Sequence, residues 1–203
     1  MDRKPGRPRA LTVELIAQAA LDDGISTFSM PSVARRLGVA HSGLYRYVTD
    51  RDDLLIQAID RAADSAQWPD PDQHWEQVLR EIGETVWHLC DTYPGIDRAL
   101  QLVPRPVPGV SVLLERYVTS LSEQGFMVED AAVGVEFAFT LTLDSSAQMA
   151  RLAAMQAAYP DRKGIPALKG FDNDEVWAGR GFYSRKLDIF LTGLATRRLG
   201  VEA

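Results

Sequence analysis

Three hydrogen-bonding side chains, those of His41, Ser42 and Tyr45, stand close together in a short predicted helix, 41–47. Imidazole, hydroxyl and phenol groups donate and accept hydrogen bonds, so these residues are the candidates for contacts with the edges of DNA bases. Gly43 lies among them, where it costs the helix about 1 kcal/mol relative to alanine and permits close approach of the backbone to DNA. The chemistry expected here is recognition of a nucleic acid.

Other residues nearby are suited to phosphate groups. Ser29 and Ser32 lie at the start of the preceding predicted helix, where hydroxyls and free amides can donate to phosphate oxygens. Arg46 and Arg51 are expected to contact the DNA backbone. The chain also begins with a basic arm that suits phosphates or a minor groove, formed by Arg3, Lys4, Arg7 and Arg9. The arm could equally be a solvated tail.

Segment 29–59 predicts the elements that position these residues. Ser29 is expected to cap a first short helix, Gly38 to supply a tight turn, and 41–47 to form the second helix. Thr49 to Asp52 resembles the capping box that opens a further helix, and Thr12 to Gly24 predicts an earlier one. Two short helices across a glycine turn are how a helix-turn-helix protein places one helix in the major groove.

Beyond residue 64 the sequence predicts only further helices and turns, so the fold class is all-α. The proline-broken segment 65–74 and the stiff segment 104–109 interrupt the helical patterns, and 159–175 is expected to be a loop. Apolar residues at helical spacing predict helices at 75–92, 96–103, 110–124, 129–158 and 182–199.

The last two predicted helices, 129–158 and 182–199, carry apolar residues over more than one stripe. A helix that is apolar on more than one face needs partners on more than one side. Two such helices from each of two subunits form a four-helix bundle, so we expect a homodimer.

Charge and composition agree with a DNA-binding head on an acidic body. The net charge of the 203 residues is −6, but residues 1–51 hold eight Lys and Arg against five Asp and Glu, so the rest is strongly acidic. A single cysteine, Cys90, excludes an intramolecular disulfide framework and a cysteine-rich zinc site, and we expect an inert core thiol. With neither an apolar run long enough to span a membrane nor a signal segment, we expect a cytoplasmic protein.

The first 60 or so residues resemble the three-helix head and connecting helix of the tetracycline-repressor (TetR) family of bacterial transcription regulators. The resemblance rests on the basic arm, the helix to Gly24, the VARRLGV turn, LYRYV, and Asp52 to Leu55. It implies a DNA-binding domain at 1–50 and a larger helical domain at 51–203 for ligand binding and dimerisation, connected by helix 51–64. Tyr47 stands where family members often place an aromatic or imidazole ring on a phosphate.

The second half resembles the tetracycline-sensing repressors themselves, through LSEQGF at 121–126, FTL at 139–141 and the final helix. Carried across, their ligand pocket implies nine residues, the last from their pocket-lining helix: Gln67, Gly83, Trp87, Gln101, Pro104, Arg105, Pro106, Tyr117 and Phe137. Trp87 and Tyr117 favour a flat or apolar ligand. Arg105 either faces this pocket or lies exposed on its proline-rich segment.

Gln101 departs from the pattern, because it stands where those repressors have the histidine that coordinates a metal. An amide is a poor ligand for a chelated divalent ion, so we expect neither a metal nor a cofactor.

The resemblance implies a ligand-responsive transcriptional regulator, in this family usually a repressor. As a homodimer it would bind a palindromic double-stranded DNA operator, and a small-molecule effector would release it. One alternative is a constitutive DNA-binding regulator without a ligand. The other is a helical enzyme, but the sequence holds no glycine-rich phosphate loop, nucleophile elbow or metal-ligand spacing, so we expect no enzymatic activity.

Overall fold

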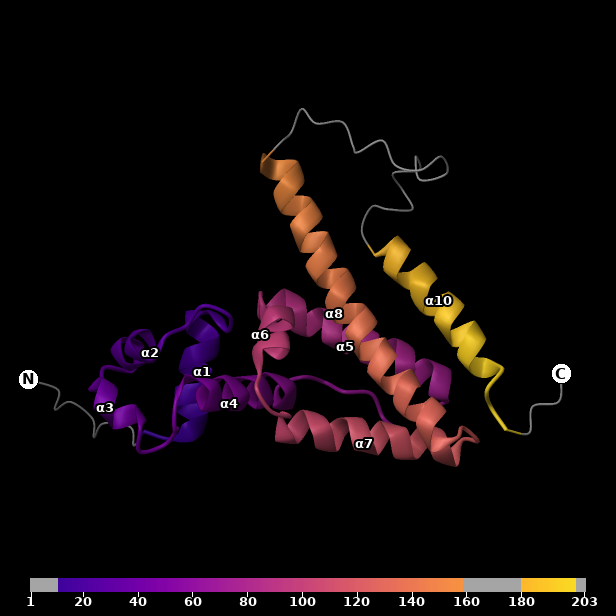
Figure 1. Ribbon diagram of the computed structural model, residues 1–203, viewed down its shortest axis with the longest axis horizontal. Coiled ribbons are helices and arrows are strands. Elements are labelled where there is room, and N and C mark those ends of the chain that lie inside the picture. Colours follow the sequence, from indigo (N-terminus) through magenta and orange to yellow (C-terminus); the bar gives the residue numbers. More distant parts are fainter. Residues whose placement is uncertain (1–10, 159–179, 200–203) are drawn as a thin grey trace, which may run out of the picture.

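The computed structural model describes residues 11–158 and 180–199, and this part of the chain is helical without strands (Figure 1). The predicted all-α class is therefore confirmed. The predicted loop at 159–175 and the basic arm with Arg3, Lys4, Arg7 and Arg9 lie outside the described residues. The helices are α1 (Val13–Gly24), α2 (Met30–Leu37), α3 (His41–Leu44), α4 (Arg51–Asp64), α5 (Trp75–Thr92), α6 (Ile96–Leu102), α7 (Pro108–Glu123), α8 (Val128–Ala158) and α10 (Gly181–Ala195).

Local capping determines where α2 begins and ends. The Ser29 hydroxyl accepts a hydrogen bond from the Ser32 amide at 3.2 Å, and the Ser32 hydroxyl accepts one from the Ser29 amide at 2.9 Å. These reciprocal bonds satisfy amides that have no partner within the helix. Gly38 ends α2 with φ 68°, a left-handed conformation that glycine adopts without strain. The capping by Ser29 and the turn at Gly38 are both as predicted.

Two predicted boundaries in this region were wrong. The second short helix ends at Leu44 instead of residue 47, and Ala40, the residue before it, offers no side-chain cap. The capping pattern at α4 is shifted by one residue. Asp50 is the cap and accepts from the Asp53 amide, while the Asp53 carboxylate accepts from the Thr49 amide, both at 2.8 Å.

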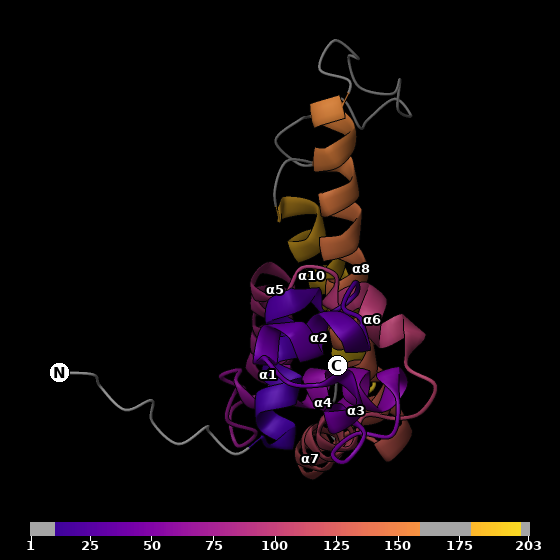
Figure 2. The same ribbon diagram turned by 90° about the vertical axis from the view of Figure 1, so that its left-hand side faces the viewer.

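Helix α4 shares one apolar core with the three helices before it. It packs against α1, and Leu54, Leu55 and Ile59 are fully buried among residues of α1, α2 and α3. Figure 2 looks onto this end of the molecule, where α1 to α4 lie together. The same core continues into the end of α5 and into α6 through Leu89, Cys90, Ile96 and Ala99. The head is therefore joined to the body through a continuous packed region.

The body is a second core formed by α5, α7, α8 and α10. Hydrogen bonds between distant segments fasten it. The Tyr117 hydroxyl donates to the Pro69 carbonyl at 2.8 Å, and the Gln124 side chain accepts from the Trp75 amide at 2.7 Å. None of the described helices is both long and apolar enough to cross a lipid bilayer.

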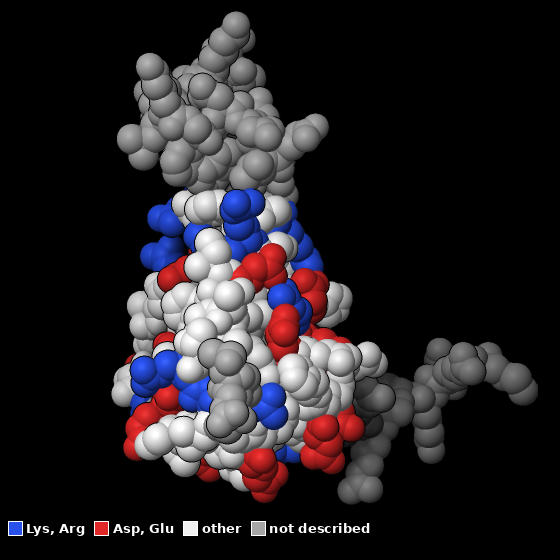
Figure 3. All heavy atoms as spheres, turned by 90° about the vertical axis from the view of Figure 1, so that its right-hand side faces the viewer, with Lys and Arg blue, Asp and Glu red and all other residues white. Residues whose placement is uncertain are grey.

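Helices α8 and α10 leave an apolar face uncovered. Val133 and Phe137 on α8 and Ile189 on α10 are exposed, and the ring of Phe137 stacks on that of Phe190 with centroids 4.2 Å apart. Figure 3 views the molecule from the side on which α10 lies, and uncharged surface occupies much of the middle of that face. The expectation that both helices are apolar on a second face is confirmed, although Leu187, Leu191 and Leu194 lie in the core.

Candidate DNA-binding face and effector cleft

The surface of α3 presents the polar side chains that the sequence singles out. His41, Ser42 and Tyr45 are all exposed, and the Tyr45 hydroxyl lies 3.3 Å from Nε2 of His41. Their rings meet edge to face, with centroids 5.2 Å apart. Leu44 and Val48 anchor the segment in the core, as predicted. The structure thus brings the three candidate base-reading residues together on one outward face.

Gly43 lies between these residues, and a Cβ atom added there would meet nothing within 4 Å. The fold itself does not require glycine at this position, because the backbone is helical and the neighbouring space is open. Close approach of a binding partner to the backbone would explain why glycine occupies this position.

The candidate phosphate contacts divide into two groups. Arg46 and Tyr47 are exposed beside α3 and have no ion pair in the described part of the chain. Ser29 and Ser32 use their hydroxyls within the α2 cap, although both hydroxyls lie at the surface. Arg51 binds within the head: its Nε donates to the Phe28 carbonyl at 3.2 Å, and its guanidinium lies over the Phe28 ring.

The sequence reasoning passed over two further cations on α2. Arg35 is exposed next to the turn, and no ion pair to it is found among the described residues. Arg36 is held against the end of α1 by a bond to the Asp22 carbonyl and a 3.6 Å ion pair with Asp23. Both arginines lie in the last turn of α2 before Gly38, and this position could have marked them as candidate DNA contacts.

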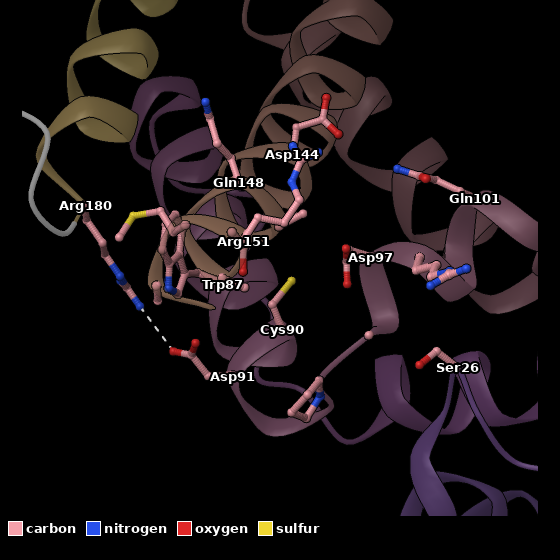
Figure 4. Close-up of a pocket in the computed structure, with 18 of the residues that line it drawn as sticks. Ser26, Trp87, Cys90, Asp91, Asp97, Gln101, Asp144, Gln148, Arg151 and Arg180 are labelled. Atoms are coloured by element: carbon pink, nitrogen blue, oxygen red, sulfur yellow. Dashed lines mark ion pairs between the residues drawn. The ribbon is translucent and has the colours of Figure 1, made fainter. Parts of the chain in front are cut away.

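A cleft of about 1360 Å³ opens between the end of α5, α6, the second half of α8 and the start of α10 (Figure 4). Of the nine predicted pocket residues, only Trp87 and Gln101 line it. Charged residues that the sequence reasoning did not select line much of the rest: Asp91, Asp97, Arg98, Asp144, Arg151, Arg180 and Lys186. These come from four separate helices, and no local motif connects them.

The other predicted pocket residues lie elsewhere. Gly83 is buried against Tyr183 and Thr142, and Tyr117 is fully buried with its hydroxyl bonded to Pro69. Phe137 belongs to the uncovered face of α8. The remaining four are exposed outside the cleft: Gln67, Pro104, Arg105 and Pro106.

Arg105 is exposed and turned towards α4. One of its terminal guanidinium nitrogens donates to a carboxylate oxygen of Asp53 at 3.1 Å. Further along α4, Asp60 accepts from the Gly109 amide at 2.9 Å, and burial raises the pKa of its carboxyl group. The segment between α6 and α7, through Arg105, and the first turn of α7, through Gly109, are therefore tied to α4 by polar contacts.

Cys90 lines the cleft from α5 but is nearly buried, and burial raises the pKa of its thiol to about 11. A thiol with such a pKa remains protonated at neutral pH and is a poor nucleophile, in agreement with an inert core cysteine. Among residues 11–158 and 180–199, no three His, Cys, Asp or Glu side chains are grouped so that they could hold a metal ion.

Comparison with known proteins gives relatives of one kind. No family model matches the chain. The HTH-type transcriptional regulator Rv1816 of Mycobacterium tuberculosis is 34% identical over 107 residues, covering 49% of this chain and 45% of that protein. The HTH-type transcriptional repressor DrrR1 of Streptomyces coeruleorubidus is 29% identical over 133 residues, covering 61% and 48%. The chain thus spans about half the length of these curated relatives.

Solved structures extend the likeness to nearly the whole chain. Apo ActR from Streptomyces coelicolor superposes with a TM-score of 0.73 at 22% identity, covering 95% of this chain and 97% of ActR. The complex of ActR, a TetR family protein, with actinorhodin gives 0.68 at 24% identity, covering 96% and 100%. The chain therefore has the fold of the TetR family of transcriptional regulators, as its sequence predicts.

Proposed function

We propose that this protein is a ligand-responsive transcriptional repressor that binds a palindromic DNA operator as a homodimer and is released by a small planar molecule. The observation that carries the proposal is the outward face of α3, where His41, Ser42 and Tyr45 are exposed around Gly43 above a buried core. Polar side chains on a rigid helix of this kind suit the donors and acceptors of the major groove. One relative is named a repressor, which supports the sign of regulation.

Selection from random double-stranded DNA tests this function. Purified full-length protein is expected to enrich a palindrome whose half-sites lie about 10 base pairs, or a multiple, apart, because two recognition helices enter successive major grooves on one face. Footprinting on the selected DNA is expected to place α3 over the protected bases. Enrichment of no sequence, or protection away from α3, would contradict the proposal.

The uncovered apolar face of α8 and α10 supports a homodimer. Val133, Phe137 and Ile189 would be buried if the same two helices of a second copy packed against them. We expect a particle twice the chain mass of 22.5 kDa in light scattering at micromolar concentration. A monomer at that concentration would remove the basis for a palindromic operator.

The packing around α4 supports a route by which a ligand in the cleft affects the head. Helix α6 lines the cleft with Asp97 and Gln101, and its Ile96 and Ala99 lie in the core shared with α4. A ligand that displaces α6 therefore also moves α4. The contacts of Arg105 and Gly109 with α4 carry residues 103–109 along with it. A coupling of about 1–3 kcal/mol suffices, and it is reciprocal, so operator DNA weakens ligand binding by the same factor.

The proposed response requires no magnesium. Gln101 lines the cleft, and its amide is a weak ligand for a divalent ion. Operator release by a planar effector, followed with and without EDTA, is expected to give the same midpoint. A strict requirement for magnesium would mean that the cleft has been misassigned.

A further inference from the structure

A cation covers the aromatic ring in the cleft. The guanidinium carbon of Arg180 lies 4.6 Å from the centre of the Trp87 ring, and Trp87 is only 6% exposed. Arg180 is held there by ion pairs with Glu84 and, at 3.7 Å, with Asp91 (Figure 4). The Glu84 and Asp91 side chains are largely exposed and that of Arg180 is 41% exposed, and ion pairs at the surface contribute little to stability. The guanidinium can therefore be replaced over the ring at small cost.

Small and large side chains share the α8 wall of the cleft. Of the eight α8 residues that line it, four are small and lie at helical spacing, Ser146, Ala147, Ala150 and Ala153. Trp87 and Cys90 line it from α5, and Asp97 and Gln101 from α6. An indole ring opposite these small side chains suits the face of an aromatic ligand.

Several charged side chains that line the cleft have no ion-pair partner among the described residues. Arg98 and Arg151 have no carboxylate partner within 4.0 Å in the described part of the chain, and Lys186 lies over the ring of Phe182. Asp97 and Asp144 likewise have no ion pair among the described residues. With Arg180 and Asp91, which pair with each other, the lining holds four cations and three carboxylates. A ligand that brings a negative charge can pair with the guanidinium groups of Arg98 and Arg151, whereas a cationic ligand cannot.

We propose that the cleft binds a planar aromatic molecule that carries an acidic group. The ring takes the place of the Arg180 guanidinium against Trp87, and the acid pairs with Arg98 and Arg151. The inference rests on the proposed function, because it names the chemical class of the effector. It also moves the effector site away from Tyr117 and Gly83, which are packed in the core.

Fluorescence quenching of Trp87 tests the site in the absence of DNA. The probes are anthraquinone-2-carboxylate and its neutral carboxamide, and the Trp87→Phe variant gives the signal of the other tryptophans. The carboxylate is expected to quench Trp87 saturably and to bind about tenfold more tightly than the amide, the gain of a charge-assisted hydrogen bond. Arg180→Ala is expected to strengthen binding of both probes, because the ring is then uncovered.

The charge assignment has a matched control. Arg98→Gln combined with Arg151→Gln is expected to remove the tenfold preference and to leave amide binding unchanged. Arg116→Gln, an exposed arginine on α7 outside the cleft, is expected to change neither. Equal binding of the two probes by the unmodified protein, preservation of the preference in the double variant, or absence of quenching by both probes would overturn the proposal.

Release of operator DNA by anthraquinone-2-carboxylate is measured in a separate experiment. Protein that binds the probe through Trp87 but selects no palindromic DNA would contradict the regulatory function and leave the site standing. Protein that binds an operator but shows no charge preference at the cleft would support the regulatory function and contradict the proposed ligand site.

Discussion

The helix caps of the head and the hydrogen bonds that fasten the body differ in how far apart along the chain their partners lie. In the head, the caps at Thr12, Ser29 and Asp50 each bind an amide three residues away. In the body, the Tyr117–Pro69 and Thr142–Tyr183 bonds join segments 48 and 41 residues apart. Short-range bonds can be predicted from the local sequence. Long-range bonds set the spacing of helices, and no local motif predicts that spacing.

The two regions also differ in what they leave uncovered. The head buries its apolar residues and presents polar ones on α3, while the body exposes apolar residues on α8 and α10 and opens a charged cleft. The contrast fits the proposed function, in which a DNA-binding head is joined to a body that binds a second copy and an effector. Four experiments test the differences between the two regions.

The largest effect is expected at the uncovered face. Ile189→Asp, at a position 69% exposed in one chain, is expected to weaken dimerisation on the order of 100-fold, because two unpaired charges enter the proposed interface. Sedimentation across a concentration series measures it. Val112→Asp, at a position 66% exposed on α7, serves as the control and is expected to leave the dimer intact. Equal association of both variants would place the interface elsewhere.

The long-range bonds of the body predict a loss of stability in alkali. Burial raises the pKa of Tyr117 from 10.0 to about 12. A raised folded-state pKa stabilises the protein below pH 10, and this contribution, about 2 kcal/mol, is lost as pH rises from 10 to 12. Burial also raises the pKa of Tyr183, which adds to the effect with the same sign.

Denaturant unfolding at several pH values measures this loss. Tyr117→Phe is expected to be less stable near pH 8 by about 1 kcal/mol, the value of a lost hydrogen bond, and to lose less stability in alkali. If Tyr117→Phe declines as steeply as the unmodified protein, Tyr117 is not the group responsible.

In the head, base-reading and phosphate-binding residues are expected to separate. Tyr45→Ala is expected to reduce the preference for the operator over a mutated site about tenfold, because it removes a contact to base edges. Arg46→Ala is expected to weaken binding to both DNAs alike and to lower the salt dependence by about one unit of slope. Titrations over a salt series distinguish the two, and interchanged behaviour would reverse the assignments.

The smallest effect is expected at Gly43, where stability and binding are predicted to move in opposite directions. Gly43→Ala is expected to stabilise the head by about 1 kcal/mol, because the helix gains and nothing lies within 4 Å of the new methyl group. Affinity for operator is expected to fall if DNA approaches the backbone there. A variant that is more stable and binds equally well would show that Gly43 has no part in DNA binding.

The sequence predicted the head closely because its signals are local. Ser29, Gly38, Leu44 and Val48 lie where the pattern of caps, turn and apolar residues places them. The errors were of one to three residues, at the end of α3 and the cap of α4, where neighbouring residues of similar chemistry compete. Thr49 and Asp50 can both accept a capping bond, and in the structure Asp50 accepts it from the Asp53 amide.

The cleft was much less predictable. Of the pocket residues carried across by position, Trp87 and Gln101 line it, whereas Tyr117 is buried with its hydroxyl bonded to the Pro69 carbonyl. The cleft depends on how far α10 lies from α5 and α6, and that distance follows from long-range packing. Arg180 and Arg151 had no local pattern to mark them.

The contacts of Asp53 could be followed by hydrogen exchange. Its carboxylate holds the Thr49 amide at 2.8 Å and also accepts from Arg105. The Thr49 amide proton can exchange with solvent deuterium only when that bond opens, so its exchange rate reports the local opening free energy at the start of α4. Loss of the Arg105 contact would accelerate exchange there. Hydrogen exchange at the Thr49 amide would then report whether the segment between α6 and α7, which holds Arg105, has moved.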